Sequence, residues 1–233
     1  MRRGLISRSP VELPDAVLDA RAARTRTAMG AENLDALLAA HALGKGVLIL
    51  TGHFGNFEVA TTAGLAQYPE ANGRFHFVRR PIRPAWLDRW VTRRFRRAGF
   101  GVLPKRGGLE AILDRLAAGD LVVFPFDQHA SRKDGVMVEF FGHPAGTFRS
   151  LAVIALSTGA PVVPAASWRE ADGRHVLRFE ERFLPVDHPD TNEAIRLNTR
   201  AYNRALERLI VRRPEQWWWV HRRWKPWPRS EKR

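Results

Sequence analysis

Short apolar runs alternate with amphipathic stretches along most of this chain, and this alternation most limits what the chain can fold into. Residues 45–50 (KGVLIL) and 121–128 (LVVFPFDQ) are almost continuously apolar, a pattern typical of parallel strands that are covered on both faces. Stretches with helical spacing separate such runs. Strands that alternate with helices predict an α/β fold, a mainly parallel sheet with helices on both faces.

The other elements follow from the same patterns. Further strands are expected within 74–80, 101–104, 160–168 and 175–183, and helices within 11–43, 58–68, 85–100, 108–120, 149–159 and 192–213. The glycine-rich residues 131–148 are expected to be irregular. We interpret residues 1–43 as an N-terminal helical layer. Residues 44–233 are the α/β core with its C-terminal helix and aromatic tail, and together they form one compact domain.

The charge balance restricts the partners of the chain. It has 38 Lys and Arg against 24 Asp and Glu, a net charge of +14, so it should attract nucleic acid, acidic lipid headgroups or an acidic carrier protein. It has no cysteine, which excludes disulfides, thiolate metal sites and cysteine nucleophiles. No apolar run reaches the ~20 residues of a membrane-spanning helix, and no signal peptide is evident. As written, the chain is expected to be cytosolic or peripheral.

A histidine and a glutamate follow the first apolar run, in the stretch TGHFGNFE. On one continuous helix His53 and Glu58 would point about 140° apart. Gly52 and Gly55 favour a turn instead, with Asn56 as the N-cap of the next helix, and such a turn can bring the two side chains together. A carboxylate on one imidazole nitrogen makes the other more basic, so that it can take a proton from a hydroxyl. The alternative is that Glu58 only complements the helix dipole.

This stretch resembles the H-x-x-x-x-[DE] block of glycerolipid acyltransferases, in the form found in the lipid A late acyltransferases, the lauroyl and myristoyl transferases. Acyltransferases of phosphatidylinositol mannosides share the pattern. The resemblance continues through FVRRP (77–81), LPKRGGLEAILDRLAAGDLVVFPFDQ (103–128), GVMVEFFGHPAGTFRSLAVIALSTGAPVVP (135–164) and RRPEQWWWVHRRWK (212–225). It implies a glycerolipid-acyltransferase-like fold and a membrane-associated O-acyltransferase, with an apolar cleft for the acyl chain at the carboxyl ends of the strands.

Carried over position by position, the resemblance implies that His53 is the general base and that Glu58 orients it. His53 would deprotonate a hydroxyl of a phosphorylated glycolipid such as a lipid A precursor. The alkoxide would then attack an acyl thioester of acyl carrier protein or coenzyme A, and no cofactor or metal is implied. Substrate-binding positions are expected at Arg80, Lys105, Arg106, Asp127, Gln128 and Thr147.

All of these positions except Arg80 also have a simpler interpretation. Arg80 can grip an acceptor phosphate through its planar guanidinium group. Lys105 and Arg106 precede two glycines and a helix, which suits anion binding, but they can equally be solvated surface charges.

The polar residues after the second apolar run, and the histidines near them, leave alternatives of the same kind. Asp127 and Gln128 can cap the turn after their strand. Thr147 can cap the following helix instead of touching substrate. His129 and His143 are interpreted as loop residues, because they lack metal-ligand spacing.

The aromatic tail and one helix offer candidate binding surfaces. Five of the eight Trp residues lie in QWWWVHRRWKPW. This mixture suits a membrane interface or base stacking, and at least two of these Trp are expected to pack on the core, as in a final strand. The helix within 85–100 sets Trp86 and Trp90 among arginines, which fits a membrane surface or an acidic carrier.

The cellular location and the alternative acceptors follow from the resemblance, whereas the alternative functions of other classes follow from the residues themselves. Members of the family typically carry a hydrophobic N-terminal anchor. This chain begins MRRGLISRSPVELP without one, so either the sequence begins downstream of the anchor or the protein is a soluble, peripheral relative. As written, we expect it at the cytoplasmic face of the inner membrane. Phosphatidylinositol mannoside or a lysophospholipid remains an alternative acceptor. A non-catalytic module that binds nucleic acid or acidic lipid is the alternative of another class, although no nucleic-acid partner is expected. The absence of a G-x-S-x-G motif disfavours a hydrolase.

Overall fold

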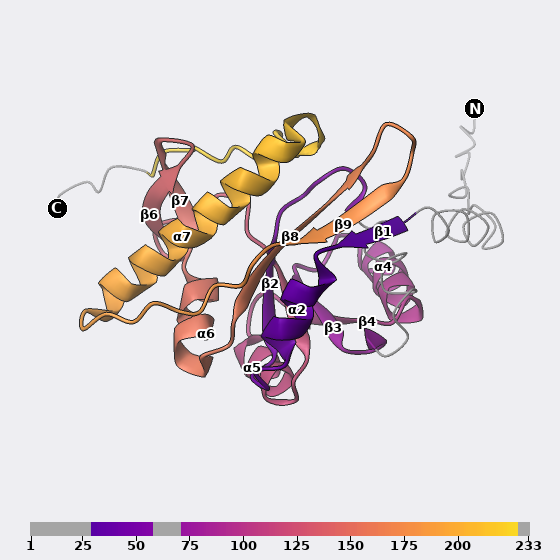
Figure 1. Cartoon of the computed structure of the whole chain (residues 1–233), viewed down its shortest axis with the longest axis horizontal. Coiled ribbons are helices and arrows are strands. Elements are labelled where there is room, and N and C mark those ends of the chain that lie inside the picture. The colour runs from indigo at the N-terminus through magenta and orange to yellow at the C-terminus, as the bar shows by residue number, and fades with distance from the viewer. Residues whose placement is uncertain (1–28, 58–70, 228–233) are drawn as a thin grey trace, which may run out of the picture.

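The computed structural model describes residues 29–57 and 71–227 (Figure 1). The strands are β1 (Met29–Glu32), β2 (Val47–Thr51), β3 (Phe75–Arg79), β4 (Phe100–Pro104), β5 (Leu121–Pro125), β6 (Gly135–Phe140), β7 (His143–Phe148), β8 (Val162–Arg169) and β9 (His175–Phe179). The helices are α2 (Leu34–His41), α4 (Ala85–Arg97), α5 (Leu109–Ala117), α6 (Ser150–Thr158), α7 (Thr191–Arg212) and the short 3₁₀ helix η2 (Pro214–Gln216).

Seven of these strands form one sheet in the order β1-β9-β8-β2-β5-β3-β4. Every neighbouring pair in it is parallel except β8 and β9. Strands β6 and β7 form a separate antiparallel hairpin. The predicted mainly parallel sheet is confirmed, and β2 lies at its centre between β8 and β5.

Helices cover both faces of the sheet, as predicted. Successive side chains of a strand point to opposite faces, so an apolar strand has two apolar faces that must both be covered. Leu48 and Leu50 of β2 belong to a core cluster with α5, α6 and α7, whereas Val47 and Ile49 belong to a second cluster with α2 and α4. All four side chains are buried. This two-sided burial explains why the strand reads as a continuous apolar run.

The entry into β2 requires a glycine. Gly46 has a φ of +67°, and a Cβ atom built there would lie 2.7 Å from the carbonyl oxygen of Leu116 in α5. Any other residue would be strained and would push the helix away. The amino end of the central strand is therefore held close against α5, which fixes where its carboxyl end lies.

Two sequence predictions about secondary structure are wrong. Residues 29–32 are not helical but form the edge strand β1, which pairs with β9, while α2 confirms a helix before Gly44. Residues 131–148 are not irregular throughout, since they include the β6–β7 hairpin. In β6 the side chains of Val138 and Phe140 are buried and that of Glu139 is exposed, the alternation of a half-buried strand. Residues 11–28 and the whole helix expected within 58–68 lie outside the described residues.

Among the helices of the described ranges, none combines the length and the apolar composition needed to cross a bilayer.

Candidate active site

The parallel pairing of β2 and β5 brings a histidine and an aspartate together. Thr51 of β2 lies opposite Pro125 of β5 in the register of the two strands. His53 and Asp127 each come two residues after the end of these strands. They leave the sheet at the carboxyl ends of neighbouring central strands, where open α/β sheets bind their ligands.

Two hydrogen bonds join these residues. Nδ1 of His53 lies 2.8 Å from Oδ1 of Asp127, and the backbone N–H of His53 donates to Oδ2 at 2.7 Å. The indole N–H of Trp217 also donates to Oδ2, at 3.1 Å. Because a carboxylate accepts, Nδ1 carries the proton and the lone pair of His53 is on Nε2. The imidazole is therefore oriented and tautomerically set as a base at Nε2.

The Asp127 carboxylate is the buried negative charge of this site, with none of its surface exposed. Burial acts to raise the pKa of Asp127, but the hydrogen bonds and charge of His53 outweigh it and hold the pKa below its ordinary value. Asp127 is thus ionised at neutral pH. A positive charge that forms on the imidazole would be stabilised by this carboxylate.

The C-terminal segment holds the turn that carries His53. The backbone N–H of Trp218 donates to the carbonyl of His53 at 2.9 Å, and Gly55 donates to the carbonyl of Gln216. Trp217 is only 2% exposed and forms a single bridge with Phe54. The predicted packing of at least two tail tryptophans on the core is confirmed by Trp217 and the partly buried Trp224, but the tail forms turns rather than a final strand.

A second histidine, which the sequence reading did not single out, lies beside His53. The rings of His53 and His221 are 4.7 Å apart between centroids. Burial lowers the pKa of His221, the His53 charge lowers it further, and Asp127 opposes both. His53, Asp127 and His221 each offer one potential metal-ligand atom within 4.8 Å of the others. A metal ion would have to replace the hydrogen bond between His53 and Asp127.

An apolar pocket of about 280 Å³ opens beside the imidazole. His53 lines it together with Pro125, Val123 and Leu121, which are alternate residues of β5, and α2 contributes Leu37. Four residues of a parallel strand span ~13 Å, so the pocket runs that far from the carboxyl edge of the sheet. A narrow apolar pocket of this kind fits an extended alkyl chain.

The far end of the pocket is polar. His41 and Arg74 line it, and both side chains hydrogen-bond to the carbonyl of Gly119, at 2.9 and 3.2 Å. Gly119 lies just before the amino end of β5. These groups end the apolar surface and so limit the length of a bound chain.

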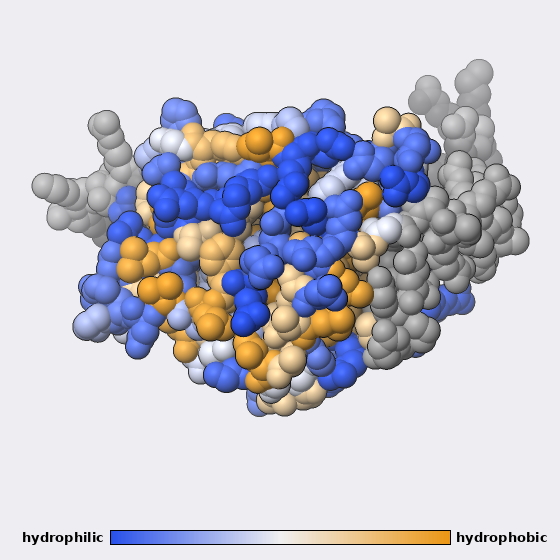
Figure 2. Space-filling view, viewed as in Figure 1, coloured by the Kyte–Doolittle hydropathy of each residue, from blue (hydrophilic) through white to orange (hydrophobic). Residues whose placement is uncertain are grey.

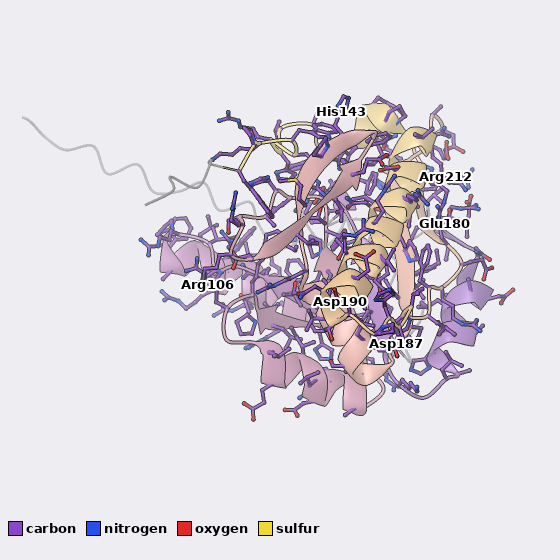
Figure 3. All side chains as sticks on the ribbon, turned by 90° about the vertical axis from the view of Figure 1, so that its left-hand side faces the viewer. Arg106, His143, Glu180, Asp187, Asp190 and Arg212 are labelled. Carbon is purple, nitrogen blue, oxygen red and sulfur yellow. The ribbon has the colours of Figure 1, made fainter. Side chains whose placement is uncertain are left out.

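Cationic side chains gather where β3 and β4 end, at the same edge of the sheet. The exposed Arg80 follows β3, and Lys105 follows β4 with its ammonium 3.7 Å from the centroid of the Phe148 ring. Burial lowers the pKa of Lys105 to about 8, with a further contribution from the charge of Arg80. A half-buried cation that is repelled by a second, exposed one favours an anionic ligand. Arg106 is exposed on the adjoining loop, on one side of the molecule in Figure 3.

The remaining predicted positions differ in their surroundings. Gln128 is half-buried beside Asp127. Thr147 is fully buried in β7, where its hydroxyl bonds Ala145, Asn203 and Arg223. It does not cap α6, whose N-cap is Arg149, so that alternative is wrong. A substrate could reach Thr147 only if this network opened.

The other residues considered from the sequence are Glu58 and two histidines, His129 and His143. Glu58 lies outside the described residues, so its expected contact with His53 stays a prediction. His129 follows β5 in a loop, as expected. His143 is not in a loop but begins β7, at one end of the molecule in Figure 3, and it is exposed.

Residues 14–226 match the family model described as bacterial lipid A biosynthesis acyltransferase. The lipid A biosynthesis palmitoleoyltransferase of Escherichia coli K12 is 30% identical over 211 residues, 89% of this chain and 65% of that protein. A phosphatidylinositol mannoside acyltransferase of Mycobacterium tuberculosis (strain ATCC 25618 / H37Rv) is 33% identical over 149 residues, 62% of this chain and 44% of that protein.

The chain thus spans about 65% of the length of the E. coli relative. Among solved structures, the 1-acyl-sn-glycerophosphate acyltransferase PlsC of Thermotoga maritima matches with a TM-score of 0.45 at 15% identity, over 83% of this chain and 79% of that one. This likeness is too distant to bear on the site.

Proposed function

Because the chain belongs to the bacterial lipid A biosynthesis acyltransferase family, we propose that it is an O-acyltransferase that moves a fatty acyl group from a thioester to a hydroxyl of a phosphorylated glycolipid. The observation that carries the proposal is the position of His53. Its ring is fixed by Asp127 and lies at the mouth of an apolar pocket.

The reaction needs one base and no protein nucleophile. Nε2 of His53 takes the proton of the acceptor hydroxyl, and the oxygen attacks the thioester carbonyl. The tetrahedral intermediate collapses, the carbon–sulfur bond breaks, and the thiolate takes the proton from the imidazolium. An ester and a free thiol result, and His53 is again neutral. During both steps the ionised Asp127 stabilises the imidazolium and keeps its ring in place.

We assign the orienting role to Asp127 because of its two hydrogen bonds to His53. Glu58 was expected to have this role, and that expectation remains open to test. One carboxylate on Nδ1 is enough to fix the tautomer.

The apolar pocket is proposed to hold the acyl chain of the donor. It begins at His53, so a thioester carbonyl at its mouth lies beside the base, and the chain extends along β2 and β5 toward Leu121. Burial of an alkyl chain contributes about 0.8 kcal/mol for each CH₂ group. Much of the donor affinity would come from this burial.

The acceptor is proposed to be a phosphorylated glycolipid such as a lipid A precursor, with Arg80 and Lys105 on its phosphate. The half-buried ammonium of Lys105 and the exposed guanidinium of Arg80 support this, since both can form charge-assisted hydrogen bonds with phosphate. Arg106 follows Lys105 and Gln128 follows Asp127 in the sequence, and both are proposed to contact the acceptor as well. A phosphatidylinositol mannoside or a lysophospholipid offers the same phosphate and is the alternative acceptor.

The protein is further proposed to work at a membrane surface, the cytoplasmic face of the inner membrane. Trp86 and Trp90 on α4 are 55% and 49% exposed, and the guanidinium of Arg94 lies 5.0 Å from the ring of Trp90. Exposed tryptophans beside arginines suit the headgroup region of an anionic bilayer. Both proposed substrates contain lipid chains, which agrees with this location.

The test is acyl transfer from radiolabelled acyl thioesters to a panel of lipids. The His53→Ala variant should lose about 10²–10⁴-fold in kcat/KM, the usual contribution of a general base. His143→Ala is the matched control, since this exposed histidine lies on the β6–β7 hairpin and should keep full activity. Full activity of His53→Ala would contradict the proposal. Tight RNA or DNA binding without thioester turnover would favour the binding-module alternative.

A further inference from the structure

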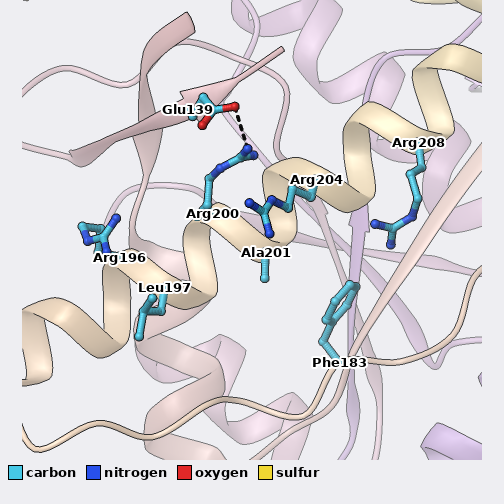
Figure 4. Close-up of a pocket in the computed structure, with 8 residues that line it drawn as sticks. All are labelled: Glu139, Phe183, Arg196, Leu197, Arg200, Ala201, Arg204 and Arg208. Atoms are coloured by element: carbon cyan, nitrogen blue, oxygen red, sulfur yellow. Dashed lines mark hydrogen bonds and ion pairs between the residues drawn. The ribbon is translucent and has the colours of Figure 1, made fainter. Parts of the chain in front are cut away.

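A row of four arginines runs along one side of α7. Arg196, Arg200, Arg204 and Arg208 are each four residues apart, so they lie on successive turns of the same helix face (Figure 4). The twelve residues from first to last span ~18 Å. Their side chains line a hollow of about 590 Å³. Figure 2 shows hydrophilic surface over α7 with hydrophobic residues beside it.

Other elements complete the hollow. Phe183, in the segment after β9, and Leu197 and Ala201 of α7 give it an apolar strip, and Glu139 of β6 stands on its other side. Leu197 is 36% exposed, so part of this strip faces solvent. We call the hollow bounded by the four arginines, Phe183 and Glu139 the α7 groove.

The two arginines nearest the C-terminal end of the groove are not neutralised. Arg200 pairs with Glu139 at 2.7 Å and with Glu207 at 3.3 Å. Within the part of the chain that the structure describes, Arg204 and Arg208 form no ion pair or hydrogen bond, and both are exposed. The positive charges of these two guanidinium groups, one helical turn apart, therefore have no negative partner in the hollow.

The spacing of Arg204 and Arg208 indicates which kind of ligand could neutralise them. A guanidinium group binds a carboxylate with two parallel hydrogen bonds. Carboxylates on successive turns of a partner helix have the same one-turn separation as Arg204 and Arg208. The apolar side chains of such a helix would meet Phe183 and Leu197. The groove therefore fits an amphipathic acidic helix.

A membrane surface fits the groove less well. The groove is concave, whereas a bilayer needs protruding apolar side chains, and these are found on α4 as Trp86 and Trp90. α4 packs on the core cluster of one sheet face and α7 on that of the other. The α7 groove thus lies on the other face of the molecule from the tryptophans of α4.

The helix that forms the groove also supports the candidate active site. On the side of α7 away from the arginines, the ring of Tyr202 lies 6.1 Å from that of Phe126, the residue before Asp127. Beyond Arg208, α7 continues into η2 and then to Trp217, whose indole bonds Asp127. The groove therefore lies across α7 from the end of β5. We propose that the α7 groove docks an acidic helix of the carrier protein that bears the acyl thioester. This inference rests on the proposed function and names the donor as a carrier protein.

Charge reversal with two donors tests the inference. Lauroyl acyl carrier protein and lauroyl coenzyme A present the same thioester, but only the first has a protein surface. In Arg204→Glu and Arg208→Glu, KM for the carrier-protein donor should rise about 10-fold with little change in kcat, since like charges then oppose each other. KM for lauroyl coenzyme A should stay within about twofold.

Lys45→Glu is the matched control, with the same change in net charge. Lys45 is exposed just before β2, at the edge of the sheet opposite His53, so both KM values should match those of the wild type. An unchanged KM for the carrier-protein donor in the arginine variants would overturn the inference. So would an equal rise for both donors, or a loss of binding to anionic phospholipid vesicles without a change in KM.

Direct binding separates this inference from the proposed function. Fluorescence anisotropy with unacylated acyl carrier protein needs no turnover, and each arginine variant should bind about 10-fold more weakly than the wild type. If the wild type turned over neither donor, the proposed function would be wrong. The binding measurement would still show whether the α7 groove binds the carrier protein. Equal binding by wild type and variants would overturn the docking site.

Discussion

Asp127 holds His53 through both of its carboxylate oxygens, one bonded to the ring at 2.8 Å and the other to the backbone N–H at 2.7 Å. The ring and the main chain of the histidine are thereby fixed to one rigid group at the end of β5. The imidazole cannot rotate without breaking the first bond. Such double attachment keeps Nε2 at the mouth of the pocket, where a hydroxyl must approach.

The Asp127→Asn variant should lose about 10²–10⁴-fold in kcat/KM. The amide can donate to Nδ1 of His53, which would place the proton on Nε2 and remove the base. Glu58→Gln should lose less, because Asp127 would still orient the ring. Steady-state kinetics on both variants, with circular dichroism to verify folding, measures this. An equal or greater loss in Glu58→Gln would return the orienting role to Glu58.

Binding of the acceptor should weaken as the pH rises through about 8. The pKa of Lys105 is lowered to about 8, so its charge is present below that pH and lost above it. KM for a phosphorylated acceptor should therefore rise across this range, with kcat changing less. In Lys105→Arg the charge persists, and the rise in KM should disappear. The same rise in both proteins would show that Lys105 does not bind the phosphate.

The same pKa shift has a consequence for stability. Between pH 8 and the ordinary lysine value of about 10.5 the unfolded chain binds a proton that the folded protein does not. The contribution of Lys105 to the free energy of unfolding therefore increases with pH in this window. Lys105→Met should remove that increase in urea unfolding curves.

The acyl-chain preference should respond to Leu121, at the far end of the apolar pocket. Leu121→Phe should shift the preference to shorter chains, and Leu121→Ala should allow longer ones. The extra volume of Phe costs about 1–3 kcal/mol of stability, so turnover is compared across chain lengths within each variant. A series of acyl coenzyme A donors of increasing length measures the profile. Unchanged profiles in both variants would exclude this pocket as the acyl site.

Arg223 should be a major stabilising residue. It is 1% exposed, and its guanidinium donates to the carbonyl of Gly146, to the hydroxyl of Thr147 and to Asn203. Arg223→Met leaves these acceptors unpaired and should lower the free energy of unfolding by about 2–4 kcal/mol. The neighbouring Arg222 is exposed, and Arg222→Met should change it by less than about 0.5 kcal/mol.

Urea unfolding of both variants checks this prediction. If they unfold at the same urea concentration, the buried network of Arg223 adds nothing to stability. A lower unfolding midpoint for Arg223→Met alone would show that the network anchors the tail to β7 and α7.

The central strands were predictable from the sequence because burial on both faces requires a continuous run of apolar residues. Residues of β2 and β5 form continuous apolar runs, and each run ends two residues before a polar side chain of the site. Their pairing was not predictable in the same way. Only the strand order makes His53 and Asp127 neighbours, although they are 74 residues apart, whereas Glu58 is near in sequence.

Other features had weaker local signals. The β6–β7 hairpin was missed because its glycine and proline residues indicate a loop, while its stability comes from contacts with α7 and the tail. The support that Trp217 and Arg223 give to the site depends on contacts with residues far away in the sequence. The arginine row of α7 is visible in the sequence, but its hollow depends on Phe183 and β6.

The bond between Trp217 and Asp127 joins residues 90 positions apart. A chain leaving the ribosome has its base and its carboxylate long before it has the tryptophan that secures them, since translation proceeds from the N-terminus. The turn around His53 also waits for Gln216 and Trp218. The site is therefore complete only after translation has passed residue 218.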